Sequence, residues 1–189
     1  SGAAPLGEDV AQACADRLGC MVKQGYGMTE SSPVTHLTAR DETDVPVDSV
    51  GHVVPNTEFR VVDVDGASDV EPGERGELWV RGPQVMKGYH NRPGATDATV
   101  DAEGWLHTGD VARVDDDHCV YIVDRVKELI KYKGYQVAPA ELESVLLAHD
   151  DIVDAAVIPS PDEEAGEVPK AFCVRTPSAR DLTAEAVMD

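Results

Sequence analysis

The sequence is short of basic residues and aromatic residues, and it lacks long hydrophobic runs. Its 189 residues include 16 Lys and Arg against 36 Asp and Glu, a formal net charge of −20 at pH 7. Nucleic acids and anionic membranes carry phosphates that such a chain repels, so this balance argues against both as partners. No apolar run approaches the ~20 residues of a membrane span, and the first residues lack the charged-then-apolar pattern of a signal peptide.

Cysteine is also scarce. Four are present, with no close pair and no metal-ligand spacing: Cys14, Cys20, Cys119 and Cys173. We expect reduced thiols in a cytoplasmic protein, because disulfides accumulate in oxidising compartments. Hydrophobic residues still make up 42% of the chain, which is enough for a buried core.

The first fifty residues combine one helical pattern with irregular segments. Leu6, Val10, Cys14 and Leu18 recur at helical spacing, and Gly19 is a natural stop. We expect a short strand at 20–24. The following residues, up to Pro33, show neither helical nor strand periodicity.

From about residue 50 to 124 the pattern changes to short strands separated by turn residues. Strands are expected at 59–64, 77–81, 111–114 and 119–123, and the last two flank a hairpin turn. This spacing indicates a small barrel or a strongly twisted sheet.

A further change falls near Arg125–Lys127. Pro139 suits the first turn of a helix whose buried face would include Leu142 and Val145. Strands follow at 152–158 and 170–175, so the second part is an α+β unit. Both ends of the chain look like interrupted patterns, and we expect an internal piece of a longer protein.

Residues Gly25-Tyr-Gly-Met-Thr-Glu30 combine features of a nucleotide site. Two glycines around an aromatic ring let the backbone approach a flat ligand on which the ring stacks. The hydroxyl of Thr29 can donate to a phosphate, and the carboxylate of Glu30 can hold Mg²⁺. A plain turn is the alternative for the two glycines alone.

Two later segments carry a carboxylate and a basic cluster. Asp110, at the end of Gly104-Trp-Leu-His-Thr-Gly-Asp110, can accept both hydroxyls of a ribose, although a turn Asp that caps a backbone amide is the simpler interpretation. Four basic residues gather in the segment after Asp124: Arg125, Lys127, Lys131 and Lys133. They form either a solvated hairpin or a local anion site. The cluster is distinctive because the rest of the chain is rich in acidic residues.

Taken together, these segments resemble the adenylate-forming superfamily of acyl-CoA synthetases, firefly luciferase and peptide-synthetase adenylation domains. The resemblance rests on residues 25–30, 76–82 and 104–110 and on the specific run 124–143. Together with Met86-Lys-Gly-Tyr89, this run makes the resemblance strongest to 4-coumarate–CoA ligases. The resemblance covers nearly the whole chain. It implies a C-terminal-half fragment. Residues 1–125 would end a large α/β AMP-binding domain, with a nucleotide loop at 24–33 and a distorted β-barrel subdomain at about 50–124. Residues 126–189 would form an incomplete α+β lid domain.

The resemblance implies an ATP-dependent carboxylic acid–CoA ligase. The acid attacks ATP to give an acyl-adenylate and pyrophosphate, and the thiol of coenzyme A then displaces AMP. Adenylation supplies the good leaving group that a free carboxylate lacks, and Mg²⁺ and basic side chains stabilise the charge.

Site residues are implied position by position. Nucleotide contacts would come from Gly2, Ala3, Ala4, Pro5, Gln24, Gly25, Tyr26, Gly27, Met28, Thr29, Asp110 and Arg125. Glu30 would hold Mg²⁺, and Lys127 would be the hinge of the lid. Lys131 and Gln136 would be catalytic. The tunnel for coenzyme A would be bordered by Lys133, Gly134 and Tyr135, and the acyl group would meet Gly27, Met28, Pro33 and Val34.

Two elements of the family pattern are missing from the sequence: the phosphate loop upstream and the catalytic lysine downstream. The resemblance therefore implies that the chain alone is inactive. The alternatives are a luciferase-type oxygenase, an adenylation domain that loads a carrier protein, and a non-catalytic nucleotide-binding fragment. The acid and the oligomeric state are not encoded in these residues.

The basic residues are 6 Lys and 10 Arg, and Asp gathers in loops such as 115–117. This shortage of Lys leads to the hypothesis of a salt-adapted host. We expect molar KCl to raise the thermal midpoint of the whole protein relative to dilute buffer, because salt screens the repulsion between surface acids. An unchanged midpoint would contradict the hypothesis.

Overall fold

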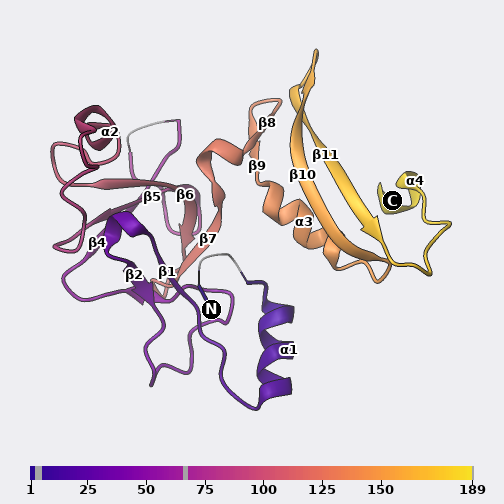
Figure 1. Cartoon of the computed structure of the whole chain (residues 1–189), viewed down its shortest axis with the longest axis horizontal. Helices are drawn as coiled ribbons and strands as arrows, with labels where there is room; N and C mark the ends of the chain where they lie inside the picture. Colours follow the sequence, from indigo (N-terminus) through magenta and orange to yellow (C-terminus); the bar gives the residue numbers. More distant parts are fainter. Residues whose placement is uncertain (3–5, 66–67, 189) are drawn as a thin grey trace. The chain divides into compact units, whose positions relative to one another are not determined.

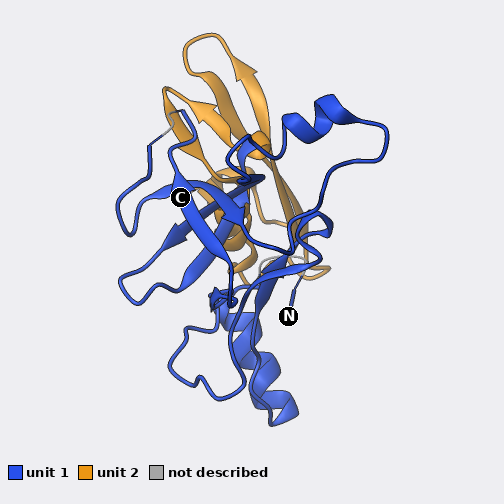
Figure 2. Ribbon diagram, turned by 90° about the vertical axis from the view of Figure 1, so that its left-hand side faces the viewer, with its two compact units in different colours: residues 1–126 blue, residues 127–189 orange. Residues whose placement is uncertain are grey.

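The computed structural model describes residues 1–2, 6–65 and 68–188. The chain divides into two compact units, Ser1–Val126 and Lys127–Asp189, which are coloured separately in Figure 2. None of the helices within these described ranges has the length and apolar character that crossing a membrane requires.

The first unit holds two antiparallel sheets, and Figure 1 labels all of their strands except β3. Its elements are α1 (Glu8–Leu18), β1 (Gly25–Gly27), η1 (Thr29–Ser31), β2 (Val34–Leu37), β3 (His52–Val53), β4 (Glu58–Val62), β5 (Arg75–Arg81), α2 (Pro93–Asp97), β6 (Leu106–Val114) and β7 (Val120–Arg125). The strand orders are β1-β2-β3 and β4-β5-β6-β7. The short helix η2 (Val126–Glu128) spans the boundary between the units.

The helix expected near the start is confirmed as α1. It ends at Gly19, which takes a left-handed conformation (φ 63°) and donates its N–H to the carbonyl of Ala15 at 2.8 Å. Glycine suits this position because it carries no Cβ to clash. The strand expected at 20–24 is wrong. The ladder with β2 begins at the pair Gly25↔Leu37, and beyond Leu37 the partner chain leaves the sheet for a loop.

The four-stranded sheet is a meander whose inner face forms the core. Along β5 the side chains alternate between buried and half-buried positions, as an amphipathic strand requires. The core cluster consists of Val50, Leu78, Val80, Ala112 and Val120. Tyr26 and Phe59 pack against it, so β1 is attached to the same core.

The β-barrel that the strand spacing predicts is not closed. In the described ranges no pairing joins β4 to β7, so both remain edges of an open sheet. An isolated bridge, Gly51↔Val120, links the segment before β3 to the start of β7. The short strands around β3 supply too few hydrogen bonds to complete a closed ladder.

The second unit is the expected α+β arrangement. It contains β8 (Ile130–Tyr132), β9 (Tyr135–Val137), α3 (Pro139–Leu147), β10 (Ile152–Asp162), β11 (Gly166–Arg175) and α4 (Ala184–Met188). The antiparallel sheet has the order β10-β11-β8-β9, and its strands are labelled in Figure 1. The β8–β9 hairpin is one of the two alternatives that the sequence predicts for the basic segment. Two three-residue strands carry too little alternation for periodicity alone to predict them.

Helix α3 begins with Pro139 at its first position, as predicted. It packs on β10, where the carboxylate of Glu143 accepts the main-chain N–H of Val157 at 2.8 Å. The predicted buried face is correct only in part. Leu142 is half-buried, but Val145 is 71% exposed because α3 contacts the sheet along one narrow side.

The core of the first unit yields a stability prediction. Leu78 is completely buried, whereas Leu18 on α1 is 66% exposed. Leu78→Ala should lower the free energy of unfolding by about 2–5 kcal/mol, because it removes buried methyl groups and leaves a cavity. Leu18→Ala should change it by less than about 0.5 kcal/mol. Urea unfolding followed by circular dichroism measures both. Equal losses in the two variants would contradict this assignment of the core.

Candidate nucleotide-binding site

The first two residues lie beside β1. The main-chain N–H of Gly25 donates to the carbonyl of Ser1 at 3.0 Å, and a Cβ on Gly2 would lie 3.5 Å from the carbonyl of Gly25. The chain start therefore reaches the strand that carries Tyr26. The other predicted adenine contacts of this segment, Ala3, Ala4 and Pro5, lie outside the described residues.

Gln24 has a structural role before any ligand binds. It is 3% exposed, and its side-chain amide donates to the carbonyls of Leu6 and Val47 at 2.9 and 2.7 Å. These bonds join the segment before α1, the start of β1 and the loop after β2. The contact with adenine expected at Gln24 can therefore come from its main chain.

The loop after β1 is closely packed. The N–H of Met28 donates to the carbonyl of Pro33 at 2.9 Å, and Ser31 Oγ donates to the same oxygen at 2.5 Å. A Cβ on Gly27 would come within 2.0 Å of that oxygen, so only glycine fits there. This loop leaves Thr29 exposed at the start of η1, where its hydroxyl can meet a phosphate.

Glu30 is held by a segment far away in the sequence. Its Oε1 accepts the hydroxyl of Tyr89 at 2.7 Å, and its carbonyl accepts the N–H of Met86 at 2.7 Å. The hydrogen bond to Glu30 raises the pKa of Tyr89. The sequence contains the 86–89 motif but assigns no contact to it, because 59 residues separate Tyr89 from its partner.

Asp110 joins the two sheets of the first unit. The hydroxyl of Tyr26 donates to its Oδ2 at 2.5 Å, and Nε of Arg125 lies 3.6 Å from its Oδ1. Asp110 and Arg125 face each other as partners of β6 and β7. Burial, together with the charge of Asp110, raises the pKa of Tyr26, so this hydroxyl stays protonated and acts as a donor.

These contacts bring several predicted residues together. Tyr26, Asp110 and Arg125 form one hydrogen-bonded and ion-paired group, and Thr29 and Glu30 follow on the same chain segment as Tyr26. No group of three or more His, Cys, Asp or Glu within residues 1–2, 6–65 and 68–188 could hold a metal ion. One carboxylate beside phosphates still fits Mg²⁺, which usually takes one or two protein carboxylates and keeps several waters.

The predicted acyl contacts after η1 have exposed side chains. Pro33 is exposed, and Val34 on β2 is 40% exposed. Gly27 and Met28 lie on the opposite arm of the same loop. The four predicted acyl contacts therefore lie on the two arms of one loop, and both residues of the second arm are exposed.

Six predicted site residues belong to the second unit: Lys127, Lys131, Gln136, Lys133, Gly134 and Tyr135. Lys131 and Gln136 are direct cross-strand partners of β8 and β9, so the two predicted catalytic side chains are neighbours. The hairpin turn places Lys133 (φ 47°) and Gly134 (φ 85°) in left-handed conformations. Lys133 pairs with Glu164 at 2.8 Å, and Tyr135 is 72% exposed. Lys127, the predicted hinge, is the first residue of this unit.

A buried histidine lies behind Tyr26. His36 faces Tyr26 across the β1–β2 ladder, and its ring centroid is 5.3 Å from that of Phe59 in an edge-on arrangement. Its Nδ1 lies 3.0 Å from the hydroxyl of Thr35, while its Nε2 is buried without a hydrogen-bond partner. Burial lowers the pKa of His36 to about 4, so the ring is neutral at physiological pH.

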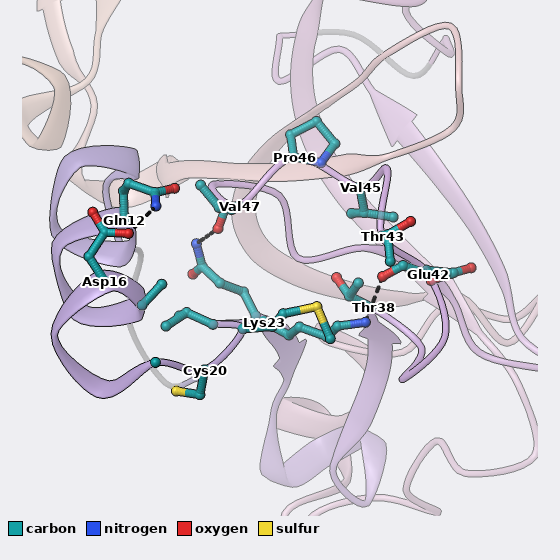
Figure 3. Close-up of a pocket in the computed structure, with 15 residues that line it drawn as sticks. Gln12, Asp16, Cys20, Lys23, Thr38, Glu42, Thr43, Val45, Pro46 and Val47 are labelled. Carbon is teal, nitrogen blue, oxygen red and sulfur yellow. Dashed lines mark hydrogen bonds between the residues drawn. The ribbon is translucent and has the colours of Figure 1, made fainter.

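An open cavity of about 590 Å³ lies between α1 and the loop after β2 (Figure 3). Two of the long polar side chains that line the cavity already donate hydrogen bonds to main-chain carbonyls. Lys23 Nζ donates to the carbonyls of Ala39, Arg40 and Glu42, and Gln24 donates to Val47. These bonds hold the 38–47 loop in place. We therefore locate the candidate site at Tyr26 and Asp110, away from this cavity.

One further cluster has the geometry of a nucleophile triad. Cys119 Sγ lies 3.6 Å from Nε2 of His52, whose Nδ1 lies 3.3 Å from Oε1 of Glu42. Burial, aided by Asp115 and Asp117, raises the pKa of the Cys119 thiol. A reactive cysteine needs a lowered thiol pKa, so the surroundings of Cys119 oppose a nucleophilic role.

Comparisons with known proteins assign the family. Residues 1–90 match the family model described as AMP-binding enzyme, and residues 141–189 match the AMP-binding enzyme C-terminal domain. The chain belongs to the AMP-binding enzymes. The resemblance found in the motifs is thereby confirmed at the level of the family.

Curated relatives and solved structures agree with this assignment. The chain is 55% identical to 4-coumarate-CoA ligase 2 of Narcissus pseudonarcissus over 193 residues, covering 100% of the chain and 34% of the relative. ATP-bound MatB from Rhodopseudomonas palustris superposes with a TM-score of 0.91 at 33% identity, covering 99% of this chain and 37% of that one. The o-succinylbenzoate CoA synthetase of Bacillus subtilis, in complex with its acyl-adenylate intermediate, gives 0.83 at 34% identity, covering 93% and 35%. The chain thus spans about a third of the length of these proteins.

His36 yields a pH prediction. Its pKa is lowered in the folded state, so its neutral form contributes stability that is present above the unfolded value of about 6.5 and is lost as the pH falls towards 4. Between pH 7 and 4.5, the wild-type chain should lose about 2 kcal/mol more unfolding free energy than His36→Leu, which cannot titrate. Urea midpoints at the two pH values measure this difference. Equal losses of unfolding free energy in the two proteins would refute the lowered pKa of His36.

Proposed function

We propose that the chain is part of an ATP-dependent carboxylic acid–CoA ligase. The acid carboxylate attacks the α-phosphorus of ATP, forming an acyl-adenylate as pyrophosphate leaves. The thiolate of coenzyme A then attacks the acyl carbon, and AMP leaves. The observation that carries the proposal is the 55% identity to a 4-coumarate-CoA ligase along the whole chain. The Tyr26–Asp110 group supports it with a site suited to a nucleoside.

The nucleoside end of ATP would bind on the first unit. The ring of Tyr26 would stack on adenine, opposite the segment that starts at Gly2. The carboxylate of Asp110 would accept the ribose hydroxyls, and its ion pair with Arg125 would keep that carboxylate oriented. Because Tyr26 is half-buried and packs on the core, its ring would be held in place before ATP arrives.

The phosphate end would lie along the loop after β1. Thr29 is exposed there and would donate to the α-phosphate. Glu30, positioned by Tyr89, would hold Mg²⁺, which supplies charge neutralisation for the leaving pyrophosphate. The acyl group would lie beside it, in contact with Gly27, Met28, Pro33 and Val34.

The second unit would supply the remaining groups. Lys131 and its cross-strand neighbour Gln136 would contact the reacting groups, and Lys127 would be the hinge about which this unit moves. The path of coenzyme A would be bordered by Lys133, Gly134 and Tyr135. The exposed, glycine-containing turn supports this role, because a slender arm can pass close to such a backbone.

A luciferase-type oxygenase and a carrier-loading adenylation domain use the same first step. We favour the ligase because two of the relatives named above are a CoA ligase and a CoA synthetase. A cytoplasmic location and the absence of nucleic-acid and membrane partners stay predictions. The acid itself is open among aromatic, arylpropenoic and medium-chain types.

The proposal predicts that the whole protein containing this chain releases pyrophosphate from ATP with one of these acids and forms its CoA thioester. Asp110→Ala should lower kcat/KM for ATP by about 10–100-fold, because hydrogen bonds to a charged acceptor are lost. The control, Asp116→Ala in an exposed turn, should stay within about twofold. Coupled pyrophosphate release and chromatography of the thioester measure the outcome.

Two results would overturn the proposal. The first is oxygen-dependent light from luciferin with no thioester product, which indicates an oxygenase. The second is transfer of the acyl group to a carrier protein but not to coenzyme A.

A further inference from the structure

The β5–β6 ladder contains a large bulge at Asp110. Glu77 pairs with Val111, and the next paired residues are Trp79 and His107. Leu78 therefore faces three residues of β6, which are Thr108, Gly109 and Asp110. Bulges re-aim side chains and are frequent next to active sites. Asp110 leaves the regular alternation of β6 at this bulge.

A bulge leaves main-chain groups without ladder partners, and side chains take their place here. Oε1 of Glu77 accepts the N–H of Gly109 at 2.9 Å. The hydroxyl of Thr108 donates to the carbonyl of Leu78 at 2.7 Å and accepts the N–H of Asp110 at 3.1 Å. Gly109 itself is left-handed, with φ 73°. Glu77 thus holds the residue directly before Asp110.

The second oxygen of Glu77 is anchored as well. Oε2 accepts the indole N–H of Trp79 at 2.8 Å. The indole is stacked on His107, with ring centroids 3.8 Å apart and planes at 10°, and Arg60 lies over its ring at 5.6 Å. Because the indole is held by both neighbours, the Glu77 carboxylate is fixed in one orientation between two N–H donors.

We propose that Glu77 is a positioning residue for nucleotide binding: it holds the Gly109 bulge that directs the Asp110 carboxylate to the ribose hydroxyls. The proposal rests on the proposed function, in which Asp110 binds ribose. Glu77 does not touch the ligand. It acts through the backbone of Gly109, while Tyr26 and Arg125 hold the Asp110 side chain from its other end.

The chemistry requires a carboxylate. Glu77 meets two N–H donors, and only a carboxylate offers an acceptor oxygen to each. Glutamine has the same shape but one acceptor, so in Glu77→Gln an amide NH₂ must face either the N–H of Gly109 or the indole N–H. The bulge then loses a stabilising hydrogen bond, and the orientation of the Asp110 carboxylate becomes less well defined.

The test measures binding of AMP and 3′-deoxy-AMP to the whole protein by calorimetric titration. The wild type should bind AMP about 10-fold more tightly than 3′-deoxy-AMP, because one hydroxyl bond to Asp110 is lost. In Glu77→Gln the affinity for AMP should fall about 10-fold and the preference for AMP should shrink to about twofold. Glu58→Gln, an exposed and ion-paired glutamate on neighbouring β4, is the matched control and should keep both values.

A second variant separates positioning from folding. Trp79→Phe removes the indole N–H, so the amide NH₂ that Glu77→Gln introduces no longer faces a donor there. The double variant Glu77→Gln/Trp79→Phe should therefore regain the preference for AMP, whereas a purely structural defect would worsen. Loss of AMP affinity with an unchanged preference for the 3′-hydroxyl would overturn the proposal, and so would failure of the rescue. A wild type that does not bind AMP would instead contradict the proposed function.

Discussion

The hydrogen bond from Tyr26 to Asp110 is the constraint on which the site depends. It spans 84 residues and joins β1 of one sheet to β6 of the other. Through it, the loop that carries Thr29 and Glu30 is held at a defined place relative to the ion pair with Arg125. Both ends are already fixed by packing and by the bulge, so the arrangement exists before a ligand binds. Preorganisation of this kind lowers the entropic cost of binding.

The proposed site explains how an acidic chain would bind an anionic nucleotide, because the site separates the charges of the two partners. A formal charge of −20 repels ATP at long range, but salt screens that repulsion beyond about 10 Å. At the proposed site, the carboxylate of Asp110 would meet neutral ribose hydroxyls, and the negative phosphates would meet the hydroxyl of Thr29. The net charge of the chain is thus a property of its surface and does not decide the chemistry.

Local patterns predicted a good part of the fold. The glycine that ends α1, the alternation of β5 and the start of α3 at Pro139 depend on neighbours in sequence. The open sheet and the bulge at Gly109 depend on register between distant strands, which periodicity does not encode. The same division holds for the site. Family motifs pointed to Tyr26 and Asp110, whereas Glu77 and Tyr89 act through contacts 32 and 59 residues away.

The crowded backbone at Gly27 determines which parts of the loop are open to redesign. A side chain there would collide with the main chain of Pro33, which a rotamer change cannot relieve. Val34, in contrast, projects from β2 with 40% of its surface exposed. Under the proposed acyl role of this loop, a library aimed at new acids would vary Val34 broadly, while Gly27 must stay constant. The crowded backbone at Gly27 would then be the fixed part of a loop whose exposed side chains can change.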